Sequence, residues 1–157
     1  MKPVAVHHHM LMGLTTPPLG EDTVERAIAM KMSKSHPDSA IFMTDTTEDV
    51  FRKIRRAYCP EGQIKDNPLL EYCFYLIFPK EGSLLIERKK EHGGNLIFDT
   101  YDDLVLAYSK KEIHPLDLKK AVAVSIDRMI EPIRKHFEKN THARKLKEQV
   151  ESFTITH

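Results

Sequence analysis

The chain has 157 residues, a formal net charge of +1 and 41% hydrophobic residues, which is typical of one folded domain or of a small domain joined to part of another. The near-zero charge gives no overall indication of a nucleic-acid partner, so such a partner must be recognised by local patches. No apolar run is long enough for a membrane span, no signal-peptide pattern is present, and Cys59 and Cys73 are too far apart for a zinc knuckle. We therefore expect a cytoplasmic protein with reduced thiols.

The N-terminal stretch begins with a short apolar run, Pro3 to Val6, that predicts a buried strand. Three histidines, His7 to His9, follow it. Neighbouring side chains of an extended backbone point to opposite faces, so these three cannot all bind one metal ion. We interpret them as structural or nucleotide-side groups. A loop from Leu14 to Gly20 then leads to a short helix that Thr23 caps. The apolar positions of this helix fall on one side: Val24, Ala27 and Ile28.

The short helix runs into five residues that form the most specific motif of the chain: Lys31, Met32, Ser33, Lys34 and Ser35. Two ammonium groups three residues apart are suited to bind a polyphosphate, because lysine is a point charge on a flexible stem. The hydroxyl groups of Ser33 and Ser35 can hydrogen-bond the oxygens that the lysines leave free. A solvated turn is the alternative interpretation. We call residues 31–35 the signature loop.

The next predicted helix begins at Thr46, which forms a capping pattern with Asp49, and extends to about Tyr58. Its predicted core stripe is Val50, Ile54, Ala57 and Tyr58. Its remaining surface carries four cations: Arg52, Lys53, Arg55 and Arg56. These cations could meet RNA phosphates, or they could form an ordinary solvated face.

An apolar helix and a hairpin are predicted next. Asn67 caps the helix, Pro68 occupies its first position, and residues 69–78 are apolar nearly all round, which places this helix at the centre of the core. Pro79 is expected to begin a turn. Two β-rich runs joined through Gly93-Gly94 then predict an antiparallel hairpin: Ser83 to Arg88 and Asn95 to Thr100.

The C-terminal third is predicted to be helical. Thr100 caps a helix over 101–108, and a long helix begins near Pro115 with apolar residues at spacings of three and four. Pro132 removes a backbone donor, so we expect it to kink or interrupt the long helix. A basic helix is predicted from Thr141 onward.

Several stretches, in this order, resemble one family: the tyrosyl-tRNA synthetases of archaeal and eukaryotic type, which are class I aminoacyl-tRNA synthetases. The resemblance rests on the signature loop, the run Lys-Ile-Arg-Arg-Ala-Tyr-Cys-Pro at 53–60, Gly93-Gly94, the run His-Pro-Leu-Asp-Leu-Lys at 114–119 and Glu-Pro-Ile-Arg-Lys at 131–135. Tryptophanyl-tRNA synthetase shares the loop and the fold, but the second and fourth runs look like the tyrosine enzyme.

The resemblance covers the C-terminal part of such an enzyme and implies a mainly α (α+β) fold. Residues 1–45 would be the end of a Rossmann-like catalytic domain that carries the signature loop. Residues 46–157 would form a helical anticodon-binding domain with one β-hairpin.

The resemblance also implies ATP with Mg2+ as cofactor. All five signature-loop residues would bind ATP. Lys31 and Lys34 would be the catalytic pair, which neutralises charge on the β- and γ-phosphates while the tyrosine carboxylate attacks the α-phosphorus. Met32 would pack near the adenine. Ser33 and Ser35 would hydrogen-bond phosphate or hold the loop closed.

The implied macromolecular partner is tRNA(Tyr), which the family reads at the anticodon. Carried over by position, the anticodon-binding residues are His92, His114 and Asp117. His92 would stack on the first anticodon base, and Asp117 would accept from a guanine edge. Alternatively, His114 and Asp117 only cap the long helix.

The sequence lacks the His-x-Gly-His motif and the tyrosine pocket of the family. We therefore expect the chain to be inactive alone and to need an N-terminal catalytic half, in cis or in trans. The edge of the Val4 strand and residues 10–12 would be the docking surface. The full-length enzyme would be a homodimer. The alternatives are a free-standing RNA-binding module derived from the synthetase and a tryptophanyl-tRNA synthetase fragment.

Overall fold

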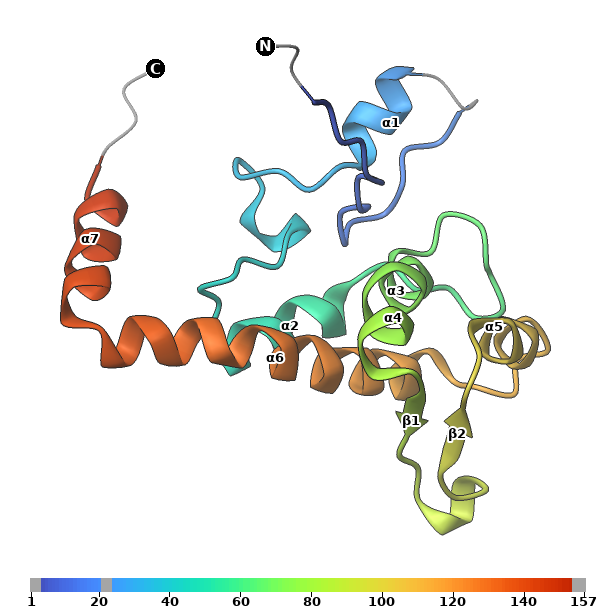
Figure 1. Ribbon diagram of the computed structural model, residues 1–157. Helices are drawn as coiled ribbons and strands as arrows, with labels where there is room; N and C mark the ends of the chain where they lie inside the picture. Colours follow the sequence, from blue (N-terminus) through green and yellow to red (C-terminus); the bar gives the residue numbers. More distant parts are fainter. Residues whose placement is uncertain (1–3, 21–23, 154–157) are drawn as a thin grey trace.

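The computed structural model describes residues 4–20 and 24–153 and is mainly helical with one two-stranded hairpin, which confirms the predicted fold class (Figure 1). In chain order the elements are α1 (Val24–Met30), η1 (Pro37–Ser39), α2 (Thr47–Arg56), α3 (Pro68–Tyr72), η2 (Cys73–Ile77), α4 (Phe78–Glu81), β1 (Leu84–Ile86), η3 (Lys90–His92), β2 (Leu96–Phe98), α5 (Tyr101–Ser109), α6 (Pro115–Lys139) and α7 (Thr141–Glu151). None of the helices within these described ranges combines the length and the apolar character that crossing a bilayer requires.

The core lies where α2 packs along α6 and where α3 and η2 cover the same helix. The side chains that fill it are almost completely buried: Val50, Ile54, Leu69, Leu70, Cys73, Ile77, Leu118, Val122 and Ile126. Their spacing of three, four and seven residues along each helix places them on one face. Helices α2, α3 and α6 and the η2 segment therefore share one continuous core, and we call them the helical scaffold.

The helix starts follow the capping residues that the sequence predicts. Thr46 and Asp49 form a capping box on α2, and Thr100 accepts a hydrogen bond from the amide of Asp103 at the start of α5. The side chain of Asn67 accepts from two amides at the start of α3, where Pro68 holds the first position. These caps satisfy amides that have no partner inside the helix.

The apolar segment after Asn67 is longer and less uniformly buried than predicted. It continues through Pro79 to Glu81, where Gly82 ends it with φ 77°. A short π-helix, η2, lies just before Pro79. The proline has no amide donor and its ring crowds the carbonyl four residues earlier, which accounts for the local departure from α-helical geometry. Phe74 and Tyr75 are 47% and 42% exposed, so one side of the segment reaches the surface.

The hairpin and the C-terminal helices match the prediction with one correction. Strands β1 and β2 pair antiparallel, with Leu85 opposite Ile97. Helix α6 runs for 25 residues through Pro132, so the interruption predicted as one of two effects of this proline is wrong. Asn140 then caps the basic helix α7, which leaves α6 at a sharp angle (Figure 1).

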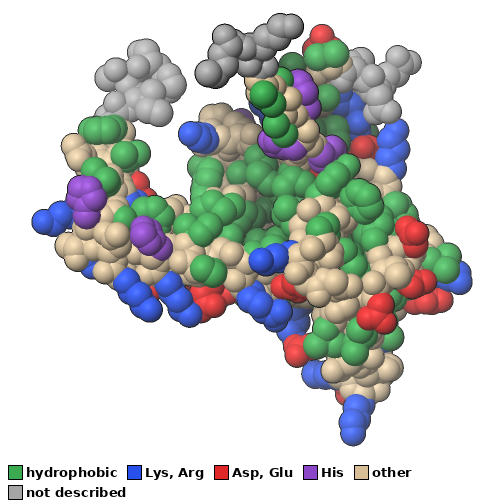
Figure 2. Space-filling view, viewed as in Figure 1, with side chains coloured by type: hydrophobic (Ala, Val, Ile, Leu, Met, Phe, Trp, Pro, Cys, Tyr) green, Lys and Arg blue, Asp and Glu red, His purple; other side chains and the backbone are tan. Residues whose placement is uncertain are grey.

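The N-terminal segment lies along the side of the helical scaffold that α2 and α3 form (Figure 1). Val4 and Val6 are 89% and 83% exposed and belong to no strand, so the strand predicted there is wrong for the described residues. A strand needs a neighbour for its backbone groups, and no described strand lies beside it. Thr23, the predicted cap of α1, lies outside the described residues. Val24 and Ile28 are also exposed, and Figure 2 shows hydrophobic side chains gathered in the hollow between this segment and α6.

Candidate nucleotide loop and nucleic-acid surface

The signature loop links α1 to η1, and its first residue is fixed by backbone contacts. Lys31 pairs with Met12 in a single antiparallel bridge, and the amide of Gly13 donates to the carbonyl of Met30 at 2.6 Å. A Cβ atom on Gly13 would lie 3.2–3.3 Å from the carbonyl oxygens of Met30, Lys31 and Ser39. Because Gly13 has no side chain, its backbone can lie this close to the backbone of the loop.

Ser39, a residue that the sequence did not single out, holds the middle of the loop. Its side chain is buried, and its Oγ accepts a hydrogen bond from the amide of Ser33 at 3.1 Å. The hydroxyl groups of Ser33 and Ser35 are hydrogen-bonded to each other at 2.8 Å. Met32 is half-buried and packs against the core. The frame of the loop is thus fixed, while its hydroxyl groups remain near the surface.

The two amines of the loop are open to solvent. Lys31 and Lys34 are exposed, and neither forms an ion pair with any residue that the structure describes. Two exposed ammonium groups on a fixed frame, with two hydroxyl groups between and after them, suit a polyphosphate. The residues present therefore fit the triphosphate of ATP.

Glu71 holds the N-terminal segment in place beside the loop. The ring of His9 stacks on Tyr75 with centroids 4.1 Å apart, and its Nε2 contacts the carboxylate of Glu71. The other oxygen of Glu71 accepts from the amide of Met12 at 2.6 Å. His9 is thus a structural group. In the described ranges, no three His, Cys, Asp or Glu side chains gather as a metal site would need.

The four cations predicted on the surface of α2 do not share one environment. Lys53 is 3% exposed, and its Nζ donates to Asp45 at 2.6 Å and to the carbonyl of Ala40 at 3.0 Å. It also lies 4.5 Å from the ring centroid of Phe42. Its assignment to the surface is therefore wrong, because Lys53 joins α2 to the segment that follows the loop.

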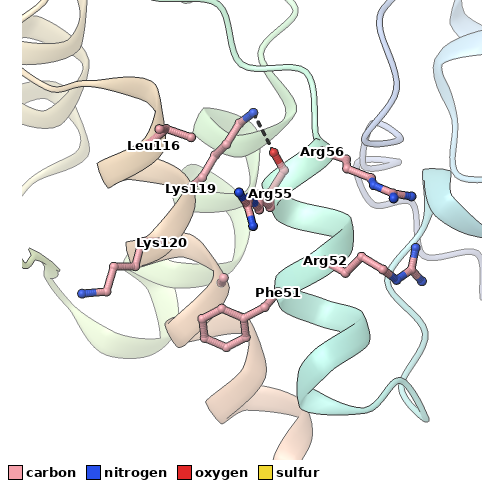
Figure 3. A pocket seen from close by; sticks show the side chains of 8 residues that line it. Phe51, Arg52, Arg55, Arg56, Leu116, Lys119 and Lys120 are labelled. Atoms are coloured by element: carbon pink, nitrogen blue, oxygen red, sulfur yellow. Dashed lines mark hydrogen bonds between the residues drawn. The ribbon is translucent and has the colours of Figure 1, made fainter.

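A basic groove of about 680 Å³ lies between α2 and α6 (Figure 3). It is lined by five cations and three apolar side chains: Phe51, Arg52, Arg55, Arg56, Leu116, Lys119, Lys120 and Ala123. No acidic side chain of the described residues lines it. The Nζ of Lys119 donates to the carbonyl of Arg55 at 3.1 Å, which fixes this amine at the end of α2. The cations in the groove provide the local patch that the net charge did not reveal.

The three predicted anticodon residues lie at two neighbouring places. His114 caps α6: its Nδ1 accepts from the amide of Leu116 at 3.1 Å, as the capping alternative expected. Asp117 is half-buried in the first turn of α6, and its carboxylate forms no ion pair with a described residue. His92 is exposed at the end of η3, near Glu91. The structure leaves all three accessible from outside.

Arg88 joins these two places. Its Nε donates to the carbonyl of Gly94 in the hairpin loop, and its Nη1 donates to the carbonyl of Glu112, two residues before His114. The hairpin tip and the start of α6 are therefore held together at one end of the molecule. The signature loop lies towards the opposite end (Figure 1).

Comparison with known proteins distinguishes the tyrosyl-tRNA synthetase family from the tryptophanyl-tRNA synthetase family. Residues 9–131 match the family model described as tRNA synthetases class I (W and Y). The chain is 41% identical, over 96% of its length, to the tyrosine–tRNA ligase of Pyrococcus furiosus. The chain belongs to the tyrosyl-tRNA synthetase family.

Other relatives agree in sequence and in structure. The chain is 42% identical to the cytoplasmic tyrosine–tRNA ligase 2 of Arabidopsis thaliana, over 99% of this chain and 19% of that one. The crystal structure of tyrosyl-tRNA synthetase from Pyrococcus horikoshii, complexed with L-tyrosine, superposes with a TM-score of 0.83 and 39% identity over 95% of this chain. This synthetase chain spans 42% of the length of each Pyrococcus relative.

The Tyr-Cys-Pro turn of this synthetase chain is structural. The thiol of Cys59 lies 3.1 Å from the hydroxyl of Tyr108, which donates to the carbonyl of Pro60 at 2.8 Å. Asn67 donates to the same thiol at 3.7 Å. Burial raises the pKa of Cys59 and keeps it protonated. The thiol therefore helps to fix the turn that carries α2 into α3.

Proposed function

We propose that the chain is the signature-loop and anticodon-binding part of a tyrosine–tRNA ligase. Residues 1–45 would belong to the catalytic domain and residues 46–157 to the anticodon-binding domain. The observation that supports this best is the pair of exposed amines, Lys31 and Lys34, on a frame that Ser39 and Gly13 fix. Such a pair suits the charge that develops on a leaving pyrophosphate.

In this proposal the loop acts by charge and position. Lys31 and Lys34 bind the β- and γ-phosphates of ATP, and Ser33 and Ser35 donate to the phosphate oxygens in place of their mutual hydrogen bond. Mg2+ with ATP would further neutralise the phosphates. Met32 would pack near the adenine. None of these residues needs to act as a nucleophile, because the carboxylate of tyrosine attacks the phosphorus.

The helical part would read tRNA(Tyr) at the anticodon. His92 would stack on the first anticodon base from the hairpin, and Asp117 would accept hydrogen bonds from a guanine edge. His114 would hold the start of α6 in place and present its exposed ring to the same loop of RNA. The link that Arg88 makes between hairpin and helix supports this grouping.

The remaining catalytic residues would come from an N-terminal half, in cis or in trans, and the complete enzyme would be a homodimer. An apolar groove of about 530 Å³ beside the signature loop offers a place for that half, with Met10, Val24 and Met30 in its lining. Met10 is 61% exposed, whereas Leu11 and Met12 are half-buried. Of the residues 10–12 that the sequence predicted as a docking surface, only Met10 is therefore exposed enough to contact the missing half. The chain alone would not activate tyrosine.

The proposal is tested by Lys34→Ala in the complete enzyme, with ATP–pyrophosphate exchange as the measurement. We expect a loss of about 100-fold or more, since one charge-stabilising donor contributes roughly 3 kcal/mol at the transition state. Lys145→Ala, an exposed lysine on α7, is the matched control and should leave exchange unchanged. Equal exchange rates for Lys34→Ala and the parent would contradict the assigned role.

A further inference from the structure

Asp38 connects the signature loop to the helical part. It lies in η1, three residues after Ser35, and its carboxylate forms ion pairs with Arg52 at 2.7 Å and with Arg56 at 3.5 Å. The next residue, Ser39, holds the amide of Ser33. The position of the loop therefore depends on where these two arginines lie.

The two arginines also border the basic groove. On α2, Phe51 and Arg55 lie towards α6, whereas the guanidinium groups of Arg52 and Arg56 point to the other side of the helix (Figure 3). All four residues line the groove. The same two turns of α2 thus carry a cation that faces α6, Arg55, and two cations that hold the loop segment, Arg52 and Arg56.

The groove has the chemistry of a surface for RNA phosphates. Within the part of the chain that the structure describes, no acidic side chain lines it and Arg55 forms no ion pair. Phe51, 37% exposed, and Leu116, 57% exposed, offer apolar contact for a base or a ribose between the cations. A polyanion in this groove would bring phosphate charge close to Arg52 and Arg56.

We propose that RNA phosphates in the groove between α2 and α6 compete with Asp38 for Arg52 and Arg56, so that RNA binding at the helical part loosens the signature loop. This inference rests on the proposed function only in taking RNA as the partner. It adds an exchange of ion pairs that couples the groove to the signature loop.

The ion pairs are suited to exchange because they are exposed. The side chains of Arg52 and Asp38 are 40% and 55% exposed, and such pairs are weak in water. The hydrogen bond from Arg52 lowers the pKa of Asp38, so the carboxylate is charged at neutral pH. Long arginine side chains can turn from this carboxylate to a phosphate without movement of the α2 backbone. Since coupling is reciprocal, fixing the loop on Asp38 weakens RNA binding.

Binding of a fluorescent tRNA(Tyr) transcript to the 157-residue chain tests the competition. Asp38→Asn should bind about two- to fivefold more tightly at low salt, because the arginines lose their competing anion. Glu138→Gln removes the same charge near the far end of α6 and is the matched control, with unchanged affinity. The double variant Arg55→Ala with Lys120→Ala should make the dependence of the log binding constant on log salt concentration less steep by about 1.5, because two phosphate contacts are lost.

Hydrogen–deuterium exchange tests the release of the loop. Saturating tRNA should speed exchange at the amides of Ser33 and His36, which are hydrogen-bonded in the free chain to Ser39 and Ser33. In Asp38→Asn these amides should exchange fast without RNA, and RNA should add no further increase. The same measurement on Glu138→Gln should reproduce the parent.

Two results would overturn the inference: unchanged loop exchange at saturating tRNA, or equal affinities for Asp38→Asn and the parent. Failure of the proposed function is recognised separately. If transcripts of other tRNAs bind as tightly as tRNA(Tyr), the anticodon assignment fails. The coupling still holds if any of these transcripts loosens the loop.

Discussion

The Nη1 of Arg88 lies 3.1 Å from the carbonyl oxygen of Glu112, and this hydrogen bond joins the hairpin to the connection between α5 and α6. The same side chain donates to Gly94 at 3.0 Å, and the amide of Arg88 donates to Asn95 at 3.0 Å. One half-buried arginine thus sets the position of the hairpin tip, with His92, relative to the start of α6.

Arg88→Ala should therefore weaken binding of tRNA(Tyr) more than it weakens the fold. We expect a loss of roughly 1–2 kcal/mol in binding, about 5- to 30-fold, because two hydrogen bonds from a charged group position His92. Lys89→Ala, an exposed neighbour that pairs only with Glu91 among the described residues, is the control. Parallel losses in the two variants would point to a general effect of charge instead.

Asp117→Ala should reduce discrimination at the first anticodon base. A well-placed pair of hydrogen bonds to a base edge contributes about 1–3 kcal/mol, so binding of tRNA(Tyr) should weaken about 5- to 150-fold. A transcript with a substituted first anticodon base should bind parent and variant equally. If Asp117 only stabilises the start of α6, the variant will unfold at a lower temperature and still bind like the parent.

The buried pair of Lys53 and Asp45 should contribute strongly to stability. Asp45→Asn leaves the ammonium group of Lys53 buried without its counter-ion, which costs about 3–5 kcal/mol in the free energy of unfolding. The double variant Asp45→Asn with Lys53→Met should recover part of this loss, since no buried charge remains. Denaturant unfolding measures both. A double variant that loses the sum of two single losses would argue against direct coupling.

Stability should fall at alkaline pH. Burial raises the pKa of Cys73 and of Tyr72 above their ordinary values of 9.0 and 10.0, so the folded chain keeps protons that the unfolded chain releases. Their contribution is complete below pH 9 and decreases as the pH rises above that value. Unfolding in denaturant at pH 8 and pH 10 should show the decrease, and Cys73→Ala should reduce it. A free energy of unfolding that is equal at the two pH values would contradict this.

Much of the fold was predictable because its signals are local. Capping residues such as Thr46 and Asn67, the proline at position 68 and the paired glycines of the hairpin each act within a few residues. The spacing of apolar residues also predicted the core face of α6. The interruption expected at Pro132 was wrong because the apolar stripe on both sides of this proline keeps α6 helical despite one missing amide donor.

The candidate site was less predictable, because its contacts join distant residues. The sequence indicated the amines of Lys31 and Lys34, but not the roles of Gly13 and Ser39, whose importance depends on close approach across the loop. The burial of Lys53 could have been found. It lies three residues after Val50, on the stripe that includes the core of α2.

The position of Asp45 has a practical consequence for dividing the protein. A cut after residue 45 would leave Lys53 in one piece and its carboxylate in the other, and would also remove the carbonyl of Ala40. The separated helices would then carry an uncompensated ammonium group in their interior. A helical fragment intended to fold by itself should therefore begin ahead of Ala40, so that it keeps both oxygen partners of that amine.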